Sequence, residues 1–212
     1  MTLEKILSLA PVIPVLVIED VAHAVPLGRA LVAGGLPVLE VTFRTEAAAA
    51  CIEAMIAEVE GAVVGAGTVL DGAMRQAAAD LGCRFAVSPG LIPGEGALGP
   101  VPLLPGVATA TELMAGLAAG FEFFKLFPAN VAGGPNALKA FQSPFAKARF
   151  CPTGGVSAAN AGDYLSLPNV VCVGGSWVAP ADAVKAGDWD RITRLAREAA
   201  ALGQRAPAPV EG

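Results

Sequence analysis

The stretch Phe121-Glu122-Phe123-Phe124-Lys125-Leu126-Phe127-Pro128 decides how the rest of the chain is interpreted. A β-strand with alternating faces places Phe123, Lys125 and Phe127 on one side, among apolar neighbours. Burial disfavours the ammonium form of a lysine, and the neutral amine is a nucleophile that can form a Schiff base with a carbonyl substrate. The alternative is a structural lysine whose stem packs on phenylalanine while its ammonium group reaches water.

Short apolar stretches of this kind alternate with Ala/Leu/Glu-rich helical stretches along the chain. Alternation of strand and helix predicts a parallel sheet, and eight such units predict an α/β fold, a (β/α)8 TIM barrel. We expect a single domain over residues 1–203 and a disordered tail over residues 204–212. The eight predicted strands are Val12–Ile18, Val38–Thr42, Val63–Ala66, Phe85–Ser88, Leu103–Pro105, Phe123–Phe127, Arg149–Thr153 and Val170–Gly174.

An open, doubly wound sheet is the rival architecture. Its nucleotide-binding signature would be Gly65-Ala66-Gly67, but Leu70 stands in place of the third glycine and the motif follows the third strand. A tight turn is therefore the better explanation. The predicted helices include Glu46–Val59, Met74–Leu81, Thr111–Ala118 and Ala158–Leu165. Gly34, Gly82 and Gly120 are predicted to end helices in the left-handed conformation.

Composition excludes several classes of protein. Of 212 residues, 54% are hydrophobic and 16% charged, which supplies a large core and rules out a disordered chain. No stretch reaches the roughly 18 uninterrupted apolar residues of a membrane span. Glu4 and Lys5 precede an apolar run that feeds directly into the fold, so we expect no signal peptide and a cytoplasmic protein. A net charge of −5 argues against nucleic acid as a partner.

The cysteines and the single histidine give no sign of a metal or redox site. The four cysteines are widely separated, contain no CxxC pair and are expected to be small buried hydrophobes. His23 is the one histidine, so a Cys/His metal site and a triad with a histidine base are both excluded. We expect His23 to be structural, and we expect neither a metal nor a cofactor.

The second predicted strand carries a glutamate that is expected to point inward. Leu39 and Val41 form one apolar face, which leaves Glu40 and Arg44 on the other. A buried glutamate is costly unless it is paired or protonated. Glu40 is therefore either a structural partner of Lys125 or Arg44, or a general acid/base. Active residues of barrels gather at the carboxyl ends of the strands, which favours the second interpretation.

Three further groups at strand ends suit a small anionic substrate. The guanidinium of Arg44 fits a carboxylate, although a surface arginine explains it nearly as well. Thr68 is either a hydrogen-bond donor or the cap of the helix that starts near Asp71. The glycine pairs Gly154-Gly155 and Gly174-Gly175 follow the last two strands, where barrels often bind phosphate through backbone N–H groups. This set predicts a Schiff-base aldolase acting on a phosphorylated keto acid.

The chain resembles the 2-keto-3-deoxy-6-phosphogluconate (KDPG) and 4-hydroxy-2-oxoglutarate (KHG) aldolase family, class I aldolases of the Entner–Doudoroff pathway. The resemblance covers roughly Ile6 to Ala200 and depends on six short motifs in order. These are Leu39-Glu40-Val41-Thr42, Val64-Gly65-Ala66-Gly67-Thr68-Val69, Ser88-Pro89-Gly90, Phe124-Lys125-Leu126-Phe127-Pro128-Ala129, Phe150-Cys151-Pro152-Thr153-Gly154-Gly155 and Gly174-Gly175-Ser176-Trp177.

The resemblance implies a role for each of these segments. It makes Lys125 the Schiff-base lysine and Glu40 the general acid/base in a homotrimeric TIM barrel that cleaves KDPG to pyruvate and D-glyceraldehyde 3-phosphate. The remaining implied substrate contacts are Arg44 and Thr68 for the pyruvate carboxylate, Pro89 and Phe127 for the pocket wall, and Thr153, Gly154, Gly155, Gly174, Gly175 and Ser176 for the phosphate.

Two departures from the family pattern leave the reading of the sugar hydroxyls open. Many relatives have a basic residue at or just after the end of the first strand, where this chain has Glu19 and Asp20, and relatives often have an acidic residue in place of Asn130. The rival substrates are 2-keto-3-deoxy-6-phosphogalactonate and unphosphorylated 4-hydroxy-2-oxoglutarate. The rival of another class is a phosphate-binding barrel without turnover, in which Lys125 and Glu40 form only an ion pair.

Overall fold

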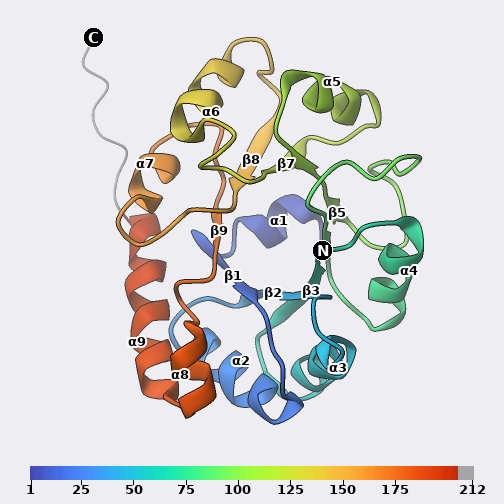
Figure 1. Ribbon diagram of the computed structural model, residues 1–212. Helices are drawn as coiled ribbons and strands as arrows, with labels where there is room; N and C mark the ends of the chain where they lie inside the picture. The colour runs from blue at the N-terminus through green and yellow to red at the C-terminus, as the bar shows by residue number, and fades with distance from the viewer. Residues whose placement is uncertain (205–212) are drawn as a thin grey trace.

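The computed structural model describes residues 1–204, which form an α/β fold with a curled parallel sheet. In Figure 1 the strands lie in the middle and helices α2 to α9 surround them. Each of the eight predicted strand stretches overlaps a strand, and one further short strand follows the fifth stretch. The strands are β1 (Val12–Leu16), β2 (Val38–Thr42), β3 (Val63–Gly67), β4 (Ala86–Val87), β5 (Leu103–Leu104), β6 (Gly106–Val107), β7 (Phe123–Leu126), β8 (Arg149–Pro152) and β9 (Val173–Gly175).

The strand order shows a half-barrel with a separate three-stranded sheet beside it. Six strands are hydrogen-bonded in the order β5-β4-β3-β2-β1-β9, and β6, β7 and β8 form the second sheet. The fifth predicted strand, Leu103–Pro105, contains only β5, and the unpredicted β6 begins directly after Pro105, which has no N–H to donate to a neighbour. Leu103 and Leu104 therefore pair with β4, whereas Gly106 and Val107 pair with β7.

The helices cover the outer face of the strands, as the apolar periodicity predicts. Leu39 and Val41 of β2 pack into this outer core together with Ile52 and Met55 of a helix, while Val38 of the same strand belongs to a second, inner cluster. The main helices are α2 (Ala24–Ala33), α3 (Ala48–Glu58), α4 (Gly72–Asp80), α5 (Ala110–Ala118), α6 (Gly134–Gln142), α7 (Ala161–Leu165), α8 (Ala181–Ala186) and α9 (Trp189–Ala200).

One predicted helix end is wrong by a residue. Gly82 and Gly120 have φ angles of +84° and +86°, as left-handed helix ends require. Gly34, however, is right-handed with φ −81°, and Gly35 takes the left-handed conformation with φ +92°. Gly34 serves a different purpose, because a Cβ atom there would lie 2.3 Å from that of Ala196 in α9. Gly34, which the sequence assigned to the left-handed helix end, is thus required for the close packing of α2 against α9.

The sequence did not predict helix α1 (Leu3–Leu7), which lies across the middle of the ring of strands (Figure 1). Thr2 caps it by accepting a hydrogen bond from the backbone N–H of Lys5. Its side chains Ile6 and Leu7 are fully buried in the inner cluster, which also includes Ile13, Val38, Phe85, Val87, Leu104, Cys151 and Cys172. A five-residue helix has too few apolar repeats for its periodicity to be recognised.

A buried arginine secures the long connection between β4 and β5. Arg75 of α4 is fully buried, and its Nε and Nη2 atoms donate to the carbonyl oxygen of Val101 over 3.0 and 2.8 Å. Its Nη1 atom donates to the carbonyl of Gly96 and forms an ion pair with Glu95. All the polar groups brought inside are thereby paired, as burial of a charge requires.

Replacement of Arg75 by methionine is expected to lower the free energy of unfolding by about 3 to 5 kcal/mol, because it leaves Glu95 and two carbonyl groups without their partner. Urea denaturation followed by circular dichroism measures the change. Arg29→Met is the matched control, since the Arg29–Glu58 pair is 3.9 Å long between side chains 63% and 59% exposed. That control is expected to cost less than about 1 kcal/mol. Equal losses in the two variants would contradict a structural role for the buried network.

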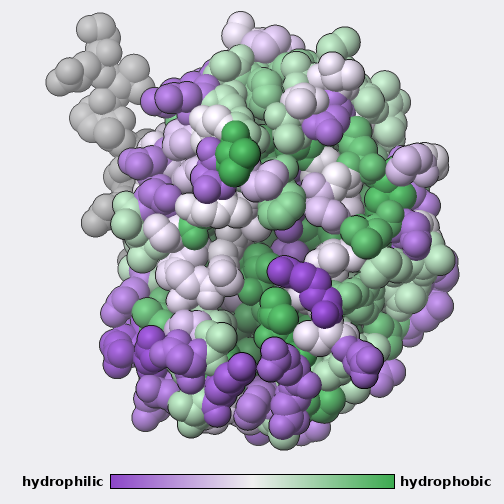
Figure 2. Space-filling model, viewed as in Figure 1, coloured by the Kyte–Doolittle hydropathy of each residue, from purple (hydrophilic) through white to green (hydrophobic). Residues whose placement is uncertain are grey.

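The surface mixes polar and apolar side chains. In Figure 2 hydrophilic residues gather along the edge formed by α2, α3 and α8, and apolar atoms are exposed elsewhere on the same face. Leu98 and Met114 are 95% and 62% exposed. Among the described helices, none combines the length and the apolar character that crossing a membrane demands. Of the predicted tail, 204–212, only Gln204 is described, as the last residue of a 3-10 helix, and residues 205–212 lie outside the described part.

Candidate active site

The structure brings Lys125 and Glu40 together in the interior of the molecule. The Nζ atom of Lys125 donates to Oε1 of Glu40 over 3.3 Å, and the two side chains are only 7% and 4% exposed. They come from β7 and β2, strands that belong to different sheets. The ammonium group also lies 5.2 Å from the centre of the Phe127 ring, within the range of a cation–π contact. The ammonium group of Lys125 is therefore buried. The structural alternative, in which it reaches water, is wrong.

Strand register explains why these two side chains face inward. Glu40 pairs with Val15 of β1 and Gly65 of β3, so its strand is held on both sides. Thr42, two residues further on the same face, is fully buried and donates its hydroxyl to the carbonyl of Leu16 over 2.9 Å. Alternation then puts the glutamate on the inner face, as the sequence predicted.

Thr68 and Arg44 lie just beyond the carboxyl ends of β3 and β2. Thr68 has φ +59° and is the one residue other than glycine with a positive φ among residues 1–204. It does not cap α4, because Asp71 accepts the hydrogen bond from the N–H of Met74. The cap alternative is therefore wrong. Arg44 is exposed and takes part in none of the ion pairs found in the described chain.

Pro89 follows β4 in a turn that a side-chain hydrogen bond stabilises. The hydroxyl of Ser88, which is fully buried, donates to the carbonyl of Gly90 over 2.7 Å. A Cβ atom on Gly106 would lie 2.2 Å from the carbonyl oxygen of Pro89, so β6 approaches this turn backbone to backbone. Pro89 itself is half-buried. Sequence reasoning gave Ser88 no role, since a serine before Pro-Gly resembles any other turn residue.

The two predicted glycine pairs lie side by side, because Thr153 and Gly174 form a parallel bridge. Gly154 and Gly155 have φ angles of +97° and +73°, which a residue with a side chain adopts only under strain. Gly174 lacks a side chain for another reason: a Cβ atom there would lie 2.3 Å from the hydroxyl of Thr153. Thr153 is buried, whereas Ser176, just after β9, is exposed.

Gly175 accommodates Trp177, whose indole ring would lie 1.8 Å from a Cβ atom at position 175. Trp177 is half-buried and packs against the outer core. The missing side chain at position 175 is thus explained by packing, whether or not an anion approaches its N–H group.

Sequence comparison decides which family this constellation represents. The family model described as KDPG and KHG aldolase matches residues 3–195. The chain belongs to the KDPG and KHG aldolase family. The resemblance drawn from six motifs is therefore confirmed.

Individual aldolases of known name agree with the family model. The KHG/KDPG aldolase of Escherichia coli (strain K12) is 53% identical over 92% of this chain and 93% of its own length. A solved structure of 2-keto-3-deoxy-6-phosphogluconate aldolase from Zymomonas mobilis ZM4 with 3-phosphoglycerate has 52% identity and a TM-score of 0.88, covering 94% of this chain and 95% of that one. The KDPG aldolase of Legionella pneumophila, with pyruvate captured as a covalent carbinolamine intermediate, has 44% identity and a TM-score of 0.90, covering 93% and 97%.

At the positions where this aldolase-family chain departs from its family, each polar side chain has a hydrogen-bond or ion-pair partner nearby. Asp20 accepts a hydrogen bond from the N–H of Ala22 over 2.9 Å, and Glu19 lies 3.7 Å from Lys185 on the surface. Asn130 accepts from the N–H of Val131 over 3.0 Å and occupies the space that a side chain on Gly155 would need. Each of these groups has a partner within the described structure.

The prediction that the cysteines of this aldolase-family chain are small buried hydrophobes is confirmed. All four cysteines are buried free thiols. A hydrogen bond with Cys151, together with burial, raises the pKa of the Cys172 thiol well above its usual value, and burial raises the pKa of Cys83 to about 12. Thiols of this kind are unreactive at neutral pH. His23 lies against the Trp189 ring, with 5.9 Å between ring centres.

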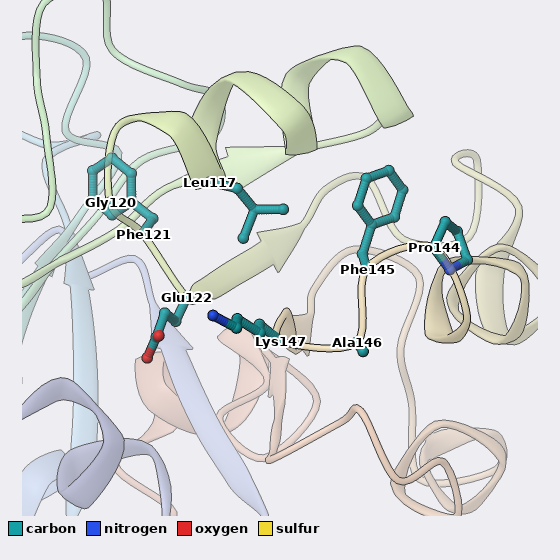
Figure 3. A pocket seen from close by; sticks show the side chains of 8 residues that line it. All are labelled: Leu117, Gly120, Phe121, Glu122, Pro144, Phe145, Ala146 and Lys147. Atoms are coloured by element: carbon teal, nitrogen blue, oxygen red, sulfur yellow. The ribbon is translucent and has the colours of Figure 1, made fainter.

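A hollow at the surface lies away from Lys125. It has a volume of about 390 Å³, and Leu117, Phe121, Glu122, Phe145 and Lys147 are among the residues that line it (Figure 3). These residues precede β7 and β8, so they lie at the amino ends of strands whose carboxyl ends carry the predicted site. None of the predicted catalytic or substrate-binding residues lines this hollow.

Proposed function

We propose that this chain is a class I aldolase, a carbon–carbon lyase that cleaves KDPG to pyruvate and D-glyceraldehyde 3-phosphate. One observation carries the proposal: a buried lysine amine lies 3.3 Å from a buried carboxylate, with both facing inward. A lysine that attacks a carbonyl needs a nearby group to exchange protons, and this pair supplies both functions. The names of relatives 52% and 53% identical over most of the chain support the same reaction.

The reaction follows from the chemistry of an imine. The Nζ atom of Lys125 attacks C2 of KDPG, and loss of water gives a protonated imine. Glu40 removes the proton of the C4 hydroxyl, the C3–C4 bond breaks, and its electron pair forms an enamine as the aldehyde leaves. The enamine is protonated at C3, and water hydrolyses the resulting imine to pyruvate and free Lys125. The protonated imine is a stronger electron sink than the carbonyl of the free keto acid.

The groups around the pair divide into two binding ends. In this proposal Arg44 and Thr68 hold the pyruvate carboxylate, and Pro89 and Phe127 form the wall of the pocket. The phosphate lies at the bridged ends of β8 and β9, where backbone N–H groups and hydroxyls suit an anion. The phosphate-binding residues are Thr153, Gly154, Gly155, Gly174, Gly175 and Ser176.

A closed (β/α)8 barrel in one domain, residues 1–203, is part of this proposal. Support comes from the two isolated parallel bridges, Phe150 to Val170 and Thr153 to Gly174, which join β8 to the segment of β9. Pro105 alone separates β5 from β6, and its carbonyl still accepts the N–H of Lys125 over 2.8 Å. β5 and β6 would then be one continuous strand, and the two sheets would be parts of one ring.

The assembly and location of the enzyme are further parts of the proposal. We expect a homotrimer, and the exposed Leu98 and Met114 side chains offer apolar surface for subunit contacts. Sedimentation equilibrium should give three times the mass of one chain. Four free cysteines suit the reducing cytoplasm, where phosphorylated sugar acids are metabolised.

Borohydride reduction in the presence of pyruvate tests the function directly. The trapped imine should appear as a stable adduct in intact-mass spectra, and peptide mapping should locate it on Lys125. Absence of an adduct from folded wild-type protein would sink the aldolase proposal and leave a binding barrel without turnover. Cleavage rates on KDPG and on its C4 epimer, 2-keto-3-deoxy-6-phosphogalactonate, then establish which phosphorylated acid is preferred.

KHG is the second candidate substrate, because the E. coli relative carries both KHG and KDPG in its name. The two substrates share the 2-keto acid end that reacts with lysine, but KHG lacks a phosphate. The chemistry at Lys125 and Glu40 would be the same for both.

Ser176→Ala is expected to lower kcat/KM for KDPG by about 10-fold, mainly through KM. The substitution removes the hydrogen bond that the Ser176 hydroxyl would donate to the charged phosphate. The rate on KHG should stay within a factor of about 2. Ser166→Ala is the control, since that exposed hydroxyl bonds only to the carbonyl of Asp163 at the end of α7. An equal loss on KHG and KDPG would remove Ser176 from the phosphate site.

A further inference from the structure

We infer that Gly67 is a positioning residue that holds the Glu40 carboxylate in reach of Lys125. The inference rests on the proposed function, since it concerns the placement of the proposed general acid/base. Gly67 ends β3 on the strand next to Glu40, where it pairs with Thr42 of β2. The glutamate side chain lies against the α-carbon of this glycine, and the contact depends on the absence of a side chain.

The available space shows how tight this contact is. A Cβ atom at position 67 would lie 2.3 Å from Oε1 of Glu40, 2.7 Å from its Cγ and 2.9 Å from its Cδ. Real Cβ atoms essentially never approach a neighbour to less than 3.0 Å. An alanine at position 67 and the observed Glu40 conformation therefore exclude each other, and one of them must move.

The backbone at position 67 has little freedom to move. The carbonyl of Gly67 accepts the N–H of Phe43 over 2.8 Å, which fixes it to β2. On the other side of β3, the N–H of Ala66 donates to Phe85 over 3.1 Å and that of Val69 to Val87 over 3.0 Å. Moving the residue would break hydrogen bonds to both neighbouring strands, each costly to lose in a buried place.

The glutamate side chain, by contrast, rotates about three bonds, so it yields first. Oε1 is both the atom that meets the added methyl group and the atom that accepts from Lys125. Displacement of the carboxylate thus changes the 3.3 Å contact directly. Because the sheet keeps its hydrogen bonds, the variant should fold while the carboxylate is misplaced.

Gly65, two residues earlier on the same strand, provides an internal contrast. A Cβ atom there would lie 2.4 Å from the ring of Phe85, so that glycine makes room for a core side chain. The motif Gly65-Ala66-Gly67 therefore contains one glycine for packing and one for the carboxylate. The tight turn that the sequence favoured for this motif is wrong, because all three residues lie within β3 (Val63–Gly67) and both glycines make room for a neighbouring side chain.

The test compares Gly67→Ala with Gly162→Ala, a glycine of α7 that has nothing within 4 Å of its would-be Cβ. For Gly67→Ala we expect kcat on KDPG to fall about 10- to 100-fold, as small misplacements of a catalytic group do. KM should change by less than a factor of about 2, because neither binding end is touched. The limb of the pH–rate profile that disappears in Glu40→Gln should shift in Gly67→Ala. Gly162→Ala should match wild type in kcat, in KM and in the pH–rate profile.

A double-mutant cycle separates action through Glu40 from a general structural effect. With Glu40 replaced by alanine the added methyl group has room, so Gly67→Ala should then alter the rate of pyruvate trapping on Lys125 by less than a factor of about 2. If Gly67→Ala lowered the trapping rate equally with and without the Glu40 side chain, the inference would be overturned. A wild-type kcat in the single variant Gly67→Ala would overturn it too. Failure of wild-type protein to form the adduct would instead refute the proposed function.

Discussion

Lys125→Ala should lose KDPG cleavage by a factor on the order of 10⁴ to 10⁶, because removal of a covalent nucleophile leaves only binding and electrostatic contributions. The borohydride-trapped adduct with pyruvate should vanish with it. The measurement is single-turnover cleavage together with intact-mass spectra of the reduced protein. Glu40 then lacks its 3.3 Å partner, so circular dichroism must establish that the variant is folded.

Lys139→Ala provides the control for this experiment, since Lys139 is exposed on α6, the helix that follows β7 along the chain. It should keep both turnover and adduct formation. An adduct that persisted in Lys125→Ala would show that another amine reacts with pyruvate. Full turnover without Lys125 would exclude the imine mechanism altogether.

Glu40→Gln should lower kcat by about 10²- to 10⁴-fold, the usual contribution of general acid–base catalysis. Glutamine keeps the size of the side chain and can still accept a hydrogen bond from Lys125, so the fold should be preserved. The loss should appear in cleavage and in the exchange of the pyruvate methyl protons with deuterated solvent, which NMR follows. Both steps require a proton to be moved next to the imine.

The control for this second experiment is Glu53→Gln, a change at an exposed carboxylate in the middle of α3. That variant should behave as wild type. If Glu40→Gln retained near wild-type kcat and proton exchange, the glutamate would be a structural partner of Lys125, and another group or a water would have to carry the protons.

Much of the fold could be predicted because the strands are short apolar runs bounded by glycine and proline. The predicted bounds of the second strand, Val38–Thr42, coincide with those of β2. Alternation along that strand correctly separated Leu39 and Val41 from Glu40. These features depend on local pattern, which a single sequence contains.

Other features depend on what lies opposite in space, and local pattern could not reveal them. Arg75 has the appearance of a surface helix residue until the carbonyl of Val101 is placed beside it. Gly35, not Gly34, takes the left-handed conformation, and Gly34 instead makes room for α9, which lies more than 150 residues further along the chain. For the candidate site, the sequence predicted that Lys125 and Glu40 both face inward, but not that Gly67 limits where the carboxylate can lie. The functions of the site residues stay predictions until the variants are measured.

The proposed reaction centre is shared between two sheets, since Glu40 belongs to the six-stranded sheet and Lys125 to the three-stranded one. The proposed nucleophile and proton acceptor are 85 residues apart in the chain and meet where these two sheets come together. A molecule in which only one of the two sheets has formed therefore has the carboxylate or the amine but not the pair. If the pair acts as proposed, activity recovered during refolding counts only molecules in which both sheets are in place.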